Sequence, residues 1–592
     1  MTDFSAEQKR YLEGMAAGMA VMKSVADAGP AAAAQPAPSG PDAPHLAAQD
    51  KALAEGKKLA DQEKWKRAEH PLDAYARLKR EADAGKAPNP QDNFRWRYHG
   101  LFWVAPAQSS YMARLRIPNG ILNHWQFAGV ADLAERHGGG YVHVTTRANL
   151  QIREIAPESA APFLEGLSDL GLMARGAGAD NIRNVTGSPT AGIDPQELID
   201  TRPLARAWHF HVLNDRSLIG LPRKFNVSFD GGGKIPALEE TNDIGFQAVE
   251  VLDGAAVPAG VWMRLALGGI SGHRDLARDT GVVVKPADCT AVADAIVRVF
   301  IAEADRTNRA KSRLKYVLDR VGFEAFLTQV EAVLGRALDR VDAAHVAPRP
   351  ATDRMAHLGR HPQVQNGRVY VGVVVPVGRL TVDQMRGVAA IARDFGDGDL
   401  RLTVWQNLLI SGVAADRAGE VEARLAALGL SAQPTSIRAG LVACTGMTGC
   451  KFANAHTKEH ALAIADRVEA RLALDMPINI HLTGCPNSCA QHYIGDIGLI
   501  GVKVPVGDDG DTVEGYDIVV GGGFAENAAI GRVLWTGVRA DAAADHVEAL
   551  LRAYLAGRTG PAETFQHFTS RMGIDHLKGV APRETRALEA VE

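Results

Sequence analysis

The chain has 592 residues, of which 46% are hydrophobic, and 65 Lys and Arg nearly balance 69 Asp and Glu, for a formal net charge of −4. This balance excludes a generally basic nucleic-acid binder, although a local cluster of cations could still hold an anion. Five cysteines are too few for a secreted disulfide scaffold, and the charged N-terminus and the lack of a long apolar run argue against a signal peptide or a membrane span. We therefore expect a soluble, cytoplasmic protein with no nucleic-acid or membrane partner.

The N-terminal part differs in composition from the rest of the chain. Residues 5–24 predict a short helix, and the Ala- and Pro-rich stretch 26–48 predicts a flexible linker. A charged helical stretch follows at 49–84, and the compact part of the molecule is expected to begin near Phe94.

The compact part contains an internal repeat, found by placing residue n beside residue n+258. In both copies a helix opens with a capping-box pattern, Asn123 with Gln126 and Thr381 with Gln384. Strand-like runs flank both helices, RLRIP and YVHVTT in copy one and YVGVVVP and LRLTV in copy two. Identical residues recur without a gap: Pro118/Pro376, Gly120/Gly378, Gln126/Gln384, Val130/Val388, Gly138/Gly396, Thr145/Thr403 and Asn149/Asn407.

The repeat continues further along the chain with a small change of register. NDIGF at 242–246 matches GDIGL at 495–499 at an offset of 253, and LGG at 267–269 matches VGG at 520–522 at the same offset. Chance similarity of Gly-rich turns is the alternative, but matched helix caps and ungapped identities favour duplication. The pattern therefore predicts an α/β protein with pseudo-twofold symmetry.

The two copies differ in the residues that carry chemistry. Copy one has Arg114 and Arg147 where copy two has Gly372 and Trp405, and it also holds LPRKFN at 221–226. Copy two instead holds four cysteines, at 444, 450, 485 and 489. A metal centre on one half and convergent cations on the other predict a single site between the halves.

The cysteine spacing favours an iron–sulfur cluster over zinc. Five residues separate Cys444 from Cys450, and three separate Cys485 from Cys489. Structural zinc sites usually leave two to four residues between paired ligands, and a thioredoxin-like pair leaves two. Four thiolates in two Gly-rich loops suit a cluster whose sulfides accept backbone hydrogen bonds. Cys289 has no partner nearby and is expected to be an inert thiol.

The cations of copy one are less specific. Taken singly, Arg114, Arg116, Arg153 and Arg183 would be surface residues or halves of ion pairs. In LPRKFN, alternation along an extended segment puts Lys224 and Asn226 on one face, where a cation beside an amide suits a small anion.

Together these residues resemble the siroheme-dependent nitrite and sulfite reductase family. The matching pieces run from about residue 90 to about 575: YMARLRIPNG, HVTTRANLQIR, NIRNVTGSPTAG, LPRKFNVSFDGGG, CTGMTGCKFANAH and TGCPNSCAQHYIGDIGLIG. The resemblance implies an α/β (α+β), internally duplicated pseudo-twofold fold with ferredoxin-like half-domains and two siroheme/Fe–S-binding domains. The expected division is 1–90 for an N-terminal extension, 91–170 and 346–430 for the half-domains, 171–345 for the siroheme and anion domain, and 431–592 for the [4Fe–4S] domain.

The resemblance also implies two cofactors and the residues that bind them. Cys444, Cys450, Cys485 and Cys489 would bind a [4Fe–4S] cluster, and Cys489 would bridge it to the siroheme iron. The many carboxylates of siroheme need cationic and amide partners, because buried unpaired charges are costly. The candidate partners are Arg114, Arg147, Arg153, Arg183, Arg223 and Asn487. The candidate anion-binding set is Arg114, Arg147, Lys224 and Asn226.

The same resemblance implies assimilatory reduction of nitrite to ammonia with electrons from ferredoxin. Sulfite-reducing relatives typically show Lys-x-Lys where this chain has Lys224-x-Asn226, and one fewer cation suits the monoanion nitrite. No convincing dinucleotide-binding motif is present, which favours a separate electron carrier. Three different functions stay open: a ferredoxin-dependent sulfite reductase, a precorrin-3B synthase-like oxygenase, and a zinc-stapled binding protein without enzymatic activity.

Overall fold

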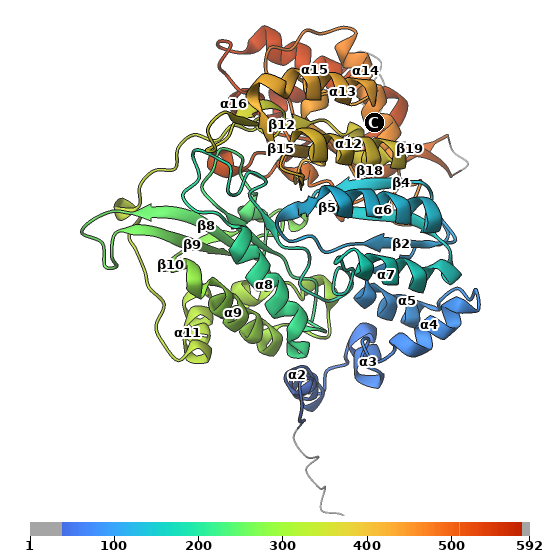
Figure 1. Ribbon diagram of the computed structural model, residues 1–592, viewed down its shortest axis with the longest axis vertical. Coiled ribbons are helices and arrows are strands. Elements are labelled where there is room, and N and C mark those ends of the chain that lie inside the picture. The colour runs from blue at the N-terminus through green and yellow to red at the C-terminus, as the bar shows by residue number, and fades with distance from the viewer. Residues whose placement is uncertain (1–37, 508–509, 583–592) are drawn as a thin grey trace, which may run out of the picture.

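The computed structural model describes residues 38–507 and 510–582, and the predicted helix at 5–24 lies outside them. Within these described residues the chain forms four five-stranded sheets, two from each copy of the repeat (Figure 1). The predicted duplication is confirmed, because equivalent strands occupy the same places in equivalent sheets. No described helix is long and apolar enough to cross a membrane.

The two half-domain sheets exchange one edge strand each. Each sheet consists of four strands from one copy, completed by a three-residue strand from the other. The first sheet has the order β1 (Leu101–Trp103), β2 (Tyr111–Arg114), β5 (Asn149–Ile155), β4 (Tyr141–Thr145), β13 (Arg379–Thr381). The second has the order β11 (Gly359–Pro362), β12 (Arg368–Val373), β15 (Leu408–Ala414), β14 (Asp399–Leu402), β3 (Ile121–Asn123).

The exchange ties the halves into one unit with a shared core. Helices α6 (His124–His137) and α12 (Val382–Phe395) follow the exchanged strands and pack together. Their apolar faces, with Phe127, Val130, Met385 and Val388, lie in one continuous hydrophobic cluster. Copy one and copy two therefore cannot separate without opening this core.

The other two sheets carry the segments of chemical interest. One has the order β10 (Arg278–Val284), β9 (Gly260–Leu267), β8 (Ile244–Val251), β7 (Val227–Asp230), β6 (Thr186–Gly187). The other has the order β16 (Leu441–Ala443), β17 (Ile480–Thr483), β18 (Ile497–Val506), β19 (Asp511–Val520), β20 (Arg532–Arg539). Val227 pairs with Ile244 as Ile480 pairs with Ile497, so the offset of 253 found in the sequence is an offset between equivalent strands.

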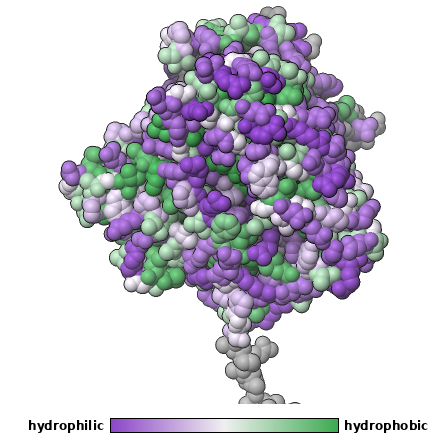
Figure 2. All heavy atoms as spheres, in the orientation of Figure 1, coloured by the Kyte–Doolittle hydropathy of each residue, from purple (hydrophilic) through white to green (hydrophobic). Residues whose placement is uncertain are grey.

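Helices cover the sheets on the outside of the molecule (Figure 1). The remaining α-helices, in chain order, are α2 (Ala43–Ala54), α3 (Asp61–Ala68), α4 (Tyr75–Asp83), α5 (Pro90–Trp96), α7 (Ala160–Asp169), α8 (Arg202–Asn214), α9 (Cys289–Glu303), α10 (Leu314–Val321), α11 (Phe323–Leu334), α13 (Ala418–Ala427), α14 (Thr457–Glu469), α15 (Ala543–Gly557), α16 (Phe565–Met572) and α17 (Ile574–Lys578). Hydrophilic and hydrophobic residues are interspersed over the face in Figure 2.

Two expectations about the N-terminal part are wrong. Helix α2 begins inside the predicted linker, and His45 on it is buried; the part of that linker before residue 38 lies outside the described residues. The compact part also begins well before Phe94, because α2 packs on α9 and α3 carries the buried side chains of Glu63 and Lys66. Composition alone misled here, since buried charged partners replace the apolar periodicity that usually marks a packed helix.

Both capping boxes predicted from the sequence are present. Asn123 accepts from the Gln126 amide nitrogen at 3.0 Å, and the Gln126 side chain accepts in return from Asn123 N. Thr381 and Gln384 repeat this arrangement in copy two. Each box thus fixes the angle between an exchanged strand and the core helix that follows it.

Replacing Asn123 by Ala should destabilise the protein by about 1 kcal/mol, because the cap acceptor is lost at a helix of the shared core. Thermal unfolding of the purified protein measures the effect. Arg136→Ala on the exposed part of the same helix is the control and should change stability by less than about 0.5 kcal/mol. Equal melting temperatures for Asn123→Ala and wild type would contradict a stabilising role for the cap.

Candidate functional site

The sheet of copy two brings three of the four cysteines together. Strands β16 and β17 run parallel, with Ala443 beside Leu482, so Cys444 and Cys485 follow the same edge of the sheet. The Gly484 amide nitrogen lies 3.2 Å from the Cys444 sulfur, and Asn454 N donates to Gly484 O at 2.7 Å. That second contact folds the loop after Cys450 back onto the same edge.

Copy one contributes directly to these cysteine loops. Arg153 on β5 donates to Gly449 O at 2.9 Å and to Thr445 Oγ1 at 3.1 Å, which fixes the loop between Cys444 and Cys450. Thr146 Oγ1 donates to Cys489 O at 2.9 Å. The cysteines therefore lie at the junction of the two halves.

The spacing of the thiols fits a cluster better than a single zinc ion. Tetrahedral zinc with Zn–S bonds of about 2.3 Å needs sulfurs roughly 3.8 Å apart. Within 38–507 and 510–582, no three of the four cysteine sulfurs lie within 4.8 Å of one another. The thiols are therefore not held at the spacing that a single tetrahedral zinc ion needs.

Cys489 lies near the cluster cysteine Cys444 and also near the cations Lys224 and Arg114 of copy one. Its side chain keeps contact with solvent, yet burial raises the pKa of its thiol to about 11, while Lys224 and Arg114 act in the opposite direction. The charged neighbours of this thiol therefore come from both copies of the repeat. Ser488, just before it, has a φ of 56° in the left-handed region, so the chain turns sharply immediately before Cys489.

Cations of copy one lie near the Cys489 thiol. Burial lowers the pKa of Lys224 to about 7 and that of Arg147 to about 10. For Arg183, burial lowers the pKa most, and Arg114 and Arg223 lower it further. In the part of the chain that the structure describes, no carboxylate forms an ion pair with any of these cations: Arg97, Arg114, Arg147, Arg183, Arg223 and Lys224.

Deep cations without acid partners are costly, and they repel one another. An anionic group in the space between them would offset this cost. A ligand that carries several carboxylates would supply the missing partners, so the residues present fit such a group. Space between the Cys489 thiol and several guanidinium groups would also suit a small anion.

A hydrogen-bonded scaffold holds Arg147 in place. Arg147 donates to Asn242 Oδ1 at 3.0 Å. With its amide oriented to match its neighbours, Asn226 accepts from Arg147 at 2.9 Å and from Arg313 at 3.3 Å. Asp243 in turn pairs with Arg313 at 2.6 Å and accepts from Asn226 N at 2.8 Å. Asn226 therefore orients two guanidinium groups.

Copy two preserves this hydrogen-bonded scaffold but lacks the cation that the scaffold holds in copy one. Asn479 and Asp496 are the equivalents of Asn226 and Asp243, and Asp496 accepts from Asn479 N at 2.8 Å and pairs with Arg354. Trp405, which replaces Arg147, lies 4.5 Å from Phe524 between ring centroids, and its side chain is 3% exposed. Packed rings thus occupy in copy two the place that cations hold in copy one.

The structure also locates the other residues expected from the sequence. Asn487 is exposed in the turn between Cys485 and Cys489, where its backbone and side chain contact the Cys485 thiol. Arg153 contacts the loop between Cys444 and Cys450, and it is not part of the cation set near Lys224. Cys289 is 1% exposed on α9, in the hydrophobic core of copy one, as expected for an inert thiol.

Sequence reasoning missed Arg97, Arg313, Asn242 and Asp243. The repeat contained a signal for the acidic partner, because NDIGF and GDIGL align Asp243 with Asp496. Extending the same offset back to Asn226 and Asn479 would have marked the amide as part of a scaffold common to both copies. Arg97 and Arg313 carry no such signal, since they lie outside the matched segments.

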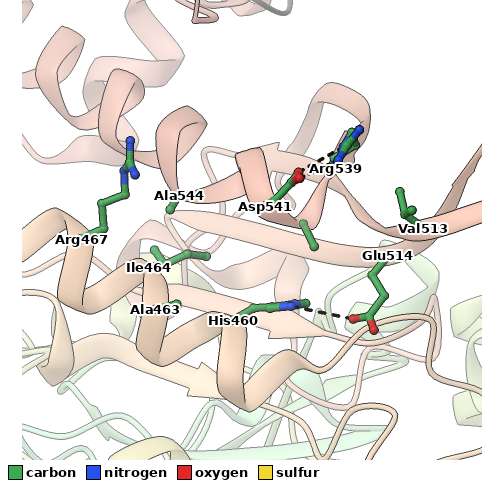
Figure 3. A pocket seen from close by; sticks show the side chains of 10 residues that line it. His460, Ala463, Ile464, Arg467, Val513, Glu514, Arg539, Asp541 and Ala544 are labelled. Atoms are coloured by element: carbon green, nitrogen blue, oxygen red, sulfur yellow. Dashed lines mark hydrogen bonds and ion pairs between the residues drawn. The ribbon is translucent and has the colours of Figure 1, made fainter. Parts of the chain in front are cut away.

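A separate groove of about 570 Å³ lies on the outside of the copy-two domain, between α14 and the start of α15 (Figure 3). Four of its charged or titratable side chains pair with one another: Arg539 with Asp541 at 2.6 Å, and His460 with Glu514 at 3.8 Å. None of the residues expected at the site lines this groove, so it is not the candidate site.

Comparison with known proteins agrees with this arrangement. The family model described as the nitrite and sulphite reductase 4Fe-4S domain matches residues 178–338 and 437–587, and that of the nitrite/sulfite reductase ferredoxin-like half domain matches 106–170 and 361–428. The chain is 37% identical to ferredoxin–nitrite reductase from Synechococcus elongatus, over 79% of the chain and 90% of that relative. It is 34% identical to the chloroplastic ferredoxin–nitrite reductase of Arabidopsis thaliana, over 78% and 79%.

A solved structure is similar over nearly its whole length. The NirA protein of Mycobacterium tuberculosis superposes with a TM-score of 0.81 at 28% identity, over 89% of this chain and 99% of that one. The fold predicted from the sequence, a duplicated α/β arrangement with ferredoxin-like half-domains, is confirmed.

Four of the five cysteines should be cluster ligands, and Cys289 should not be. Cys485→Ser should lose most of the iron and acid-labile sulfide, because a cluster needs all of its thiolate ligands. Metal and sulfide analysis of the purified protein measures the loss. Cys289→Ser is the matched control and should retain wild-type iron content. Unchanged iron in Cys485→Ser, or stoichiometric zinc in the wild type, would contradict the cluster.

Proposed function

Because the chain belongs to the nitrite and sulphite reductase family, we propose that it reduces nitrite to ammonia at a siroheme coupled to its [4Fe–4S] cluster, with electrons from reduced ferredoxin. The observation that carries the siroheme is the set of deep cations without acid partners that faces the Cys489 thiol. The relatives named ferredoxin–nitrite reductase support the substrate and the donor. The division of the chain into five parts, at 90, 170, 345 and 430, stays a prediction.

The cations near Cys489 fit siroheme by charge, because siroheme carries several carboxylates. Arg97, Arg153, Arg223 and Asn487 would also contact the cofactor, and its carboxylates would neutralise the cations among them. Cys489 would hold the siroheme beside the cluster, as the family resemblance implies. When bound, the two cofactors supply the electrons and the iron on which the anion is reduced.

The protein's own task is to bind the anion and to deliver protons. Arg114, Arg147 and Lys224 form the proposed anion site, and the position of Arg183 among Arg114, Arg147 and Arg223 adds it to that set. Guanidinium groups donate hydrogen bonds to oxygens in a fixed geometry and polarise them. Lys224 has a pKa lowered to about 7, which lets it hold or release a proton near neutral pH.

Asn226 is the residue proposed to favour nitrite over sulfite. Its carbonyl oxygen orients Arg147 and Arg313, and its neutral side chain keeps a further positive charge out of the cation set. Sulfite is largely dianionic near neutral pH and would be better matched by an additional cation. A ferredoxin-dependent sulfite reductase is accordingly the nearest competing function.

Cofactor content separates the proposed nitrite reductase from two more distant functions. A precorrin-3B synthase-like oxygenase would carry a cluster but no siroheme absorption. A zinc-stapled binding protein would contain neither iron nor sulfide, and it would leave the deep cations without a purpose. The proposed location is the cytoplasm, with ferredoxin as the partner.

The proposed function is tested with the purified protein in two steps. Absorption spectra with and without nitrite should show siroheme bands that shift when nitrite is added. Turnover with reduced ferredoxin should then yield ammonia, with a higher kcat/KM for nitrite than for sulfite. A spectrum without siroheme bands, or a clear preference for sulfite, would overturn the proposal.

Lys224→Met should lower kcat/KM for nitrite by about a hundredfold, because it removes a positioned charge and a proton donor. Steady-state kinetics with reduced ferredoxin measures the change. Lys234→Met is the matched control, since Lys234 is exposed at the surface of the same domain and pairs only loosely with Asp353, at 3.7 Å. Similar losses in both variants would argue against a role for Lys224 in the anion site.

Asn226→Lys should raise the ratio of sulfite to nitrite turnover, because it adds a cation beside Arg147 and Arg313. Asn226→Leu is the control, since it removes the same acceptor without adding charge. Both variants should reduce nitrite more slowly, but only the lysine variant should shift the ratio. If the ratio is the same in the two variants, Asn226 orients the arginines without selecting the substrate.

A further inference from the structure

A buried ionic network joins the N-terminal helix α3 to the anion-site domain. Lys66 contacts Glu63 on its own helix and lies 3.6 Å from Asp180. Glu63 also pairs with Arg306 at 2.7 Å. The side chains of Lys66, Glu63 and Asp180 are 5%, 1% and 0% exposed, so the whole network is shielded from water.

The network ends on the two segments that carry the cations of the site. Lys66 Nζ donates to Leu221 O at 2.8 Å and to Gly220 O at 3.2 Å. These carbonyls come directly before Pro222, Arg223 and Lys224 in the chain. Lys66 is therefore attached to the base of the loop that presents Lys224.

The second segment is held through Asp180. This carboxylate lies three residues before Arg183 and also pairs with Arg309 at 2.7 Å. The two segments are bonded to each other, because Arg183 N donates to Phe225 O at 2.8 Å and Phe225 N donates to Asn181 O at 3.0 Å. Lys66, in the N-terminal extension, thus contacts both the segment before Arg183 and the segment before Lys224.

The energetics favour a positioning role over a purely stabilising one. A buried ion pair gains little over apolar packing of the same volume, whereas removing one partner leaves an uncompensated buried charge. Burial lowers the pKa of Lys66, and Glu63 and Asp180 offset part of that shift. What the network provides is a fixed geometry, since the amine must satisfy two carbonyls and two carboxylates at once.

We propose that Lys66 is a positioning residue for the anion site: it acts through the backbone of residues 220–224 and through Asp180, and it keeps Lys224 and Arg183 at the distance that the anion requires. The N-terminal extension is then a working part of the site, although both matched family models begin after it, at residues 106 and 178. The proposal rests on the proposed function only in taking the site to bind nitrite.

The test uses the full-length holoprotein and two independent readouts. Hydrogen–deuterium exchange reports on the backbone at 219–226 without any assumption about the reaction. Nitrite titration by absorption and steady-state kinetics report on the site. Lys66→Met removes the charge at similar volume, and Lys64→Met, on the exposed side of the same helix, is the matched control.

In Lys66→Met, exchange at 219–226 should accelerate while exchange at 480–490 stays as in the wild type. KM for nitrite should rise by on the order of tenfold or more, because small displacements of positioned groups have large effects. Lys66→Arg should restore part of both, and Lys64→Met should match the wild type. If Lys66→Met fails to fold, Glu63→Gln/Lys66→Met, which removes both charges, takes its place.

Wild-type exchange at 219–226 in the Lys66 variants would overturn the proposal. Uniformly faster exchange throughout the chain would also overturn it, because it would indicate only a loss of global stability. Faster exchange confined to 219–226 in a protein that does not reduce nitrite would support the positioning role and contradict the proposed function. The two hypotheses can therefore fail separately.

Discussion

The candidate site depends on a set of cations near Cys489 that form no ion pair with a carboxylate of the described residues. Most proteins pair such charges within the fold, and here nearby acids do so for Arg313 and Arg309, through Asp243 and Asp180. Arg114, Arg147, Arg183 and Lys224 have no such partners among the described residues. An anionic group bound between them would offset their cost.

Duplication explains how one chain builds such a site. The exchanged strands β3 and β13 and the shared core hold the two copies together. Side chains at the junction of the copies therefore keep their relative positions. The same amide–carboxylate scaffold occurs in both copies, as Asn226 with Asp243 and as Asn479 with Asp496. Divergence then placed cations on one copy and thiols on the other, and Trp405 fills the position equivalent to Arg147.

Contacts across the junction connect the two kinds of chemistry. Arg153 and Thr146 of copy one fix the cysteine loops of copy two. Lys66 of the N-terminal extension is attached to the loop that carries Lys224. A group that binds between thiol and cations is thus held by segments from three distant parts of the sequence.

The sequence by itself determined the duplication, the helix caps, the four-thiolate set and the separation of cations from thiols, because these follow from local spacing and from comparison of one half with the other. Only the tertiary structure decided which charges are paired. Asp243 and Arg313 are 70 residues apart, and no local pattern predicts that they meet. It also decided that Asn226 orients Arg147, that Arg153 holds a cysteine loop, and that a segment expected to be a linker begins a packed helix. Burial and ion pairing depend on contacts between distant segments, which residue order does not encode locally.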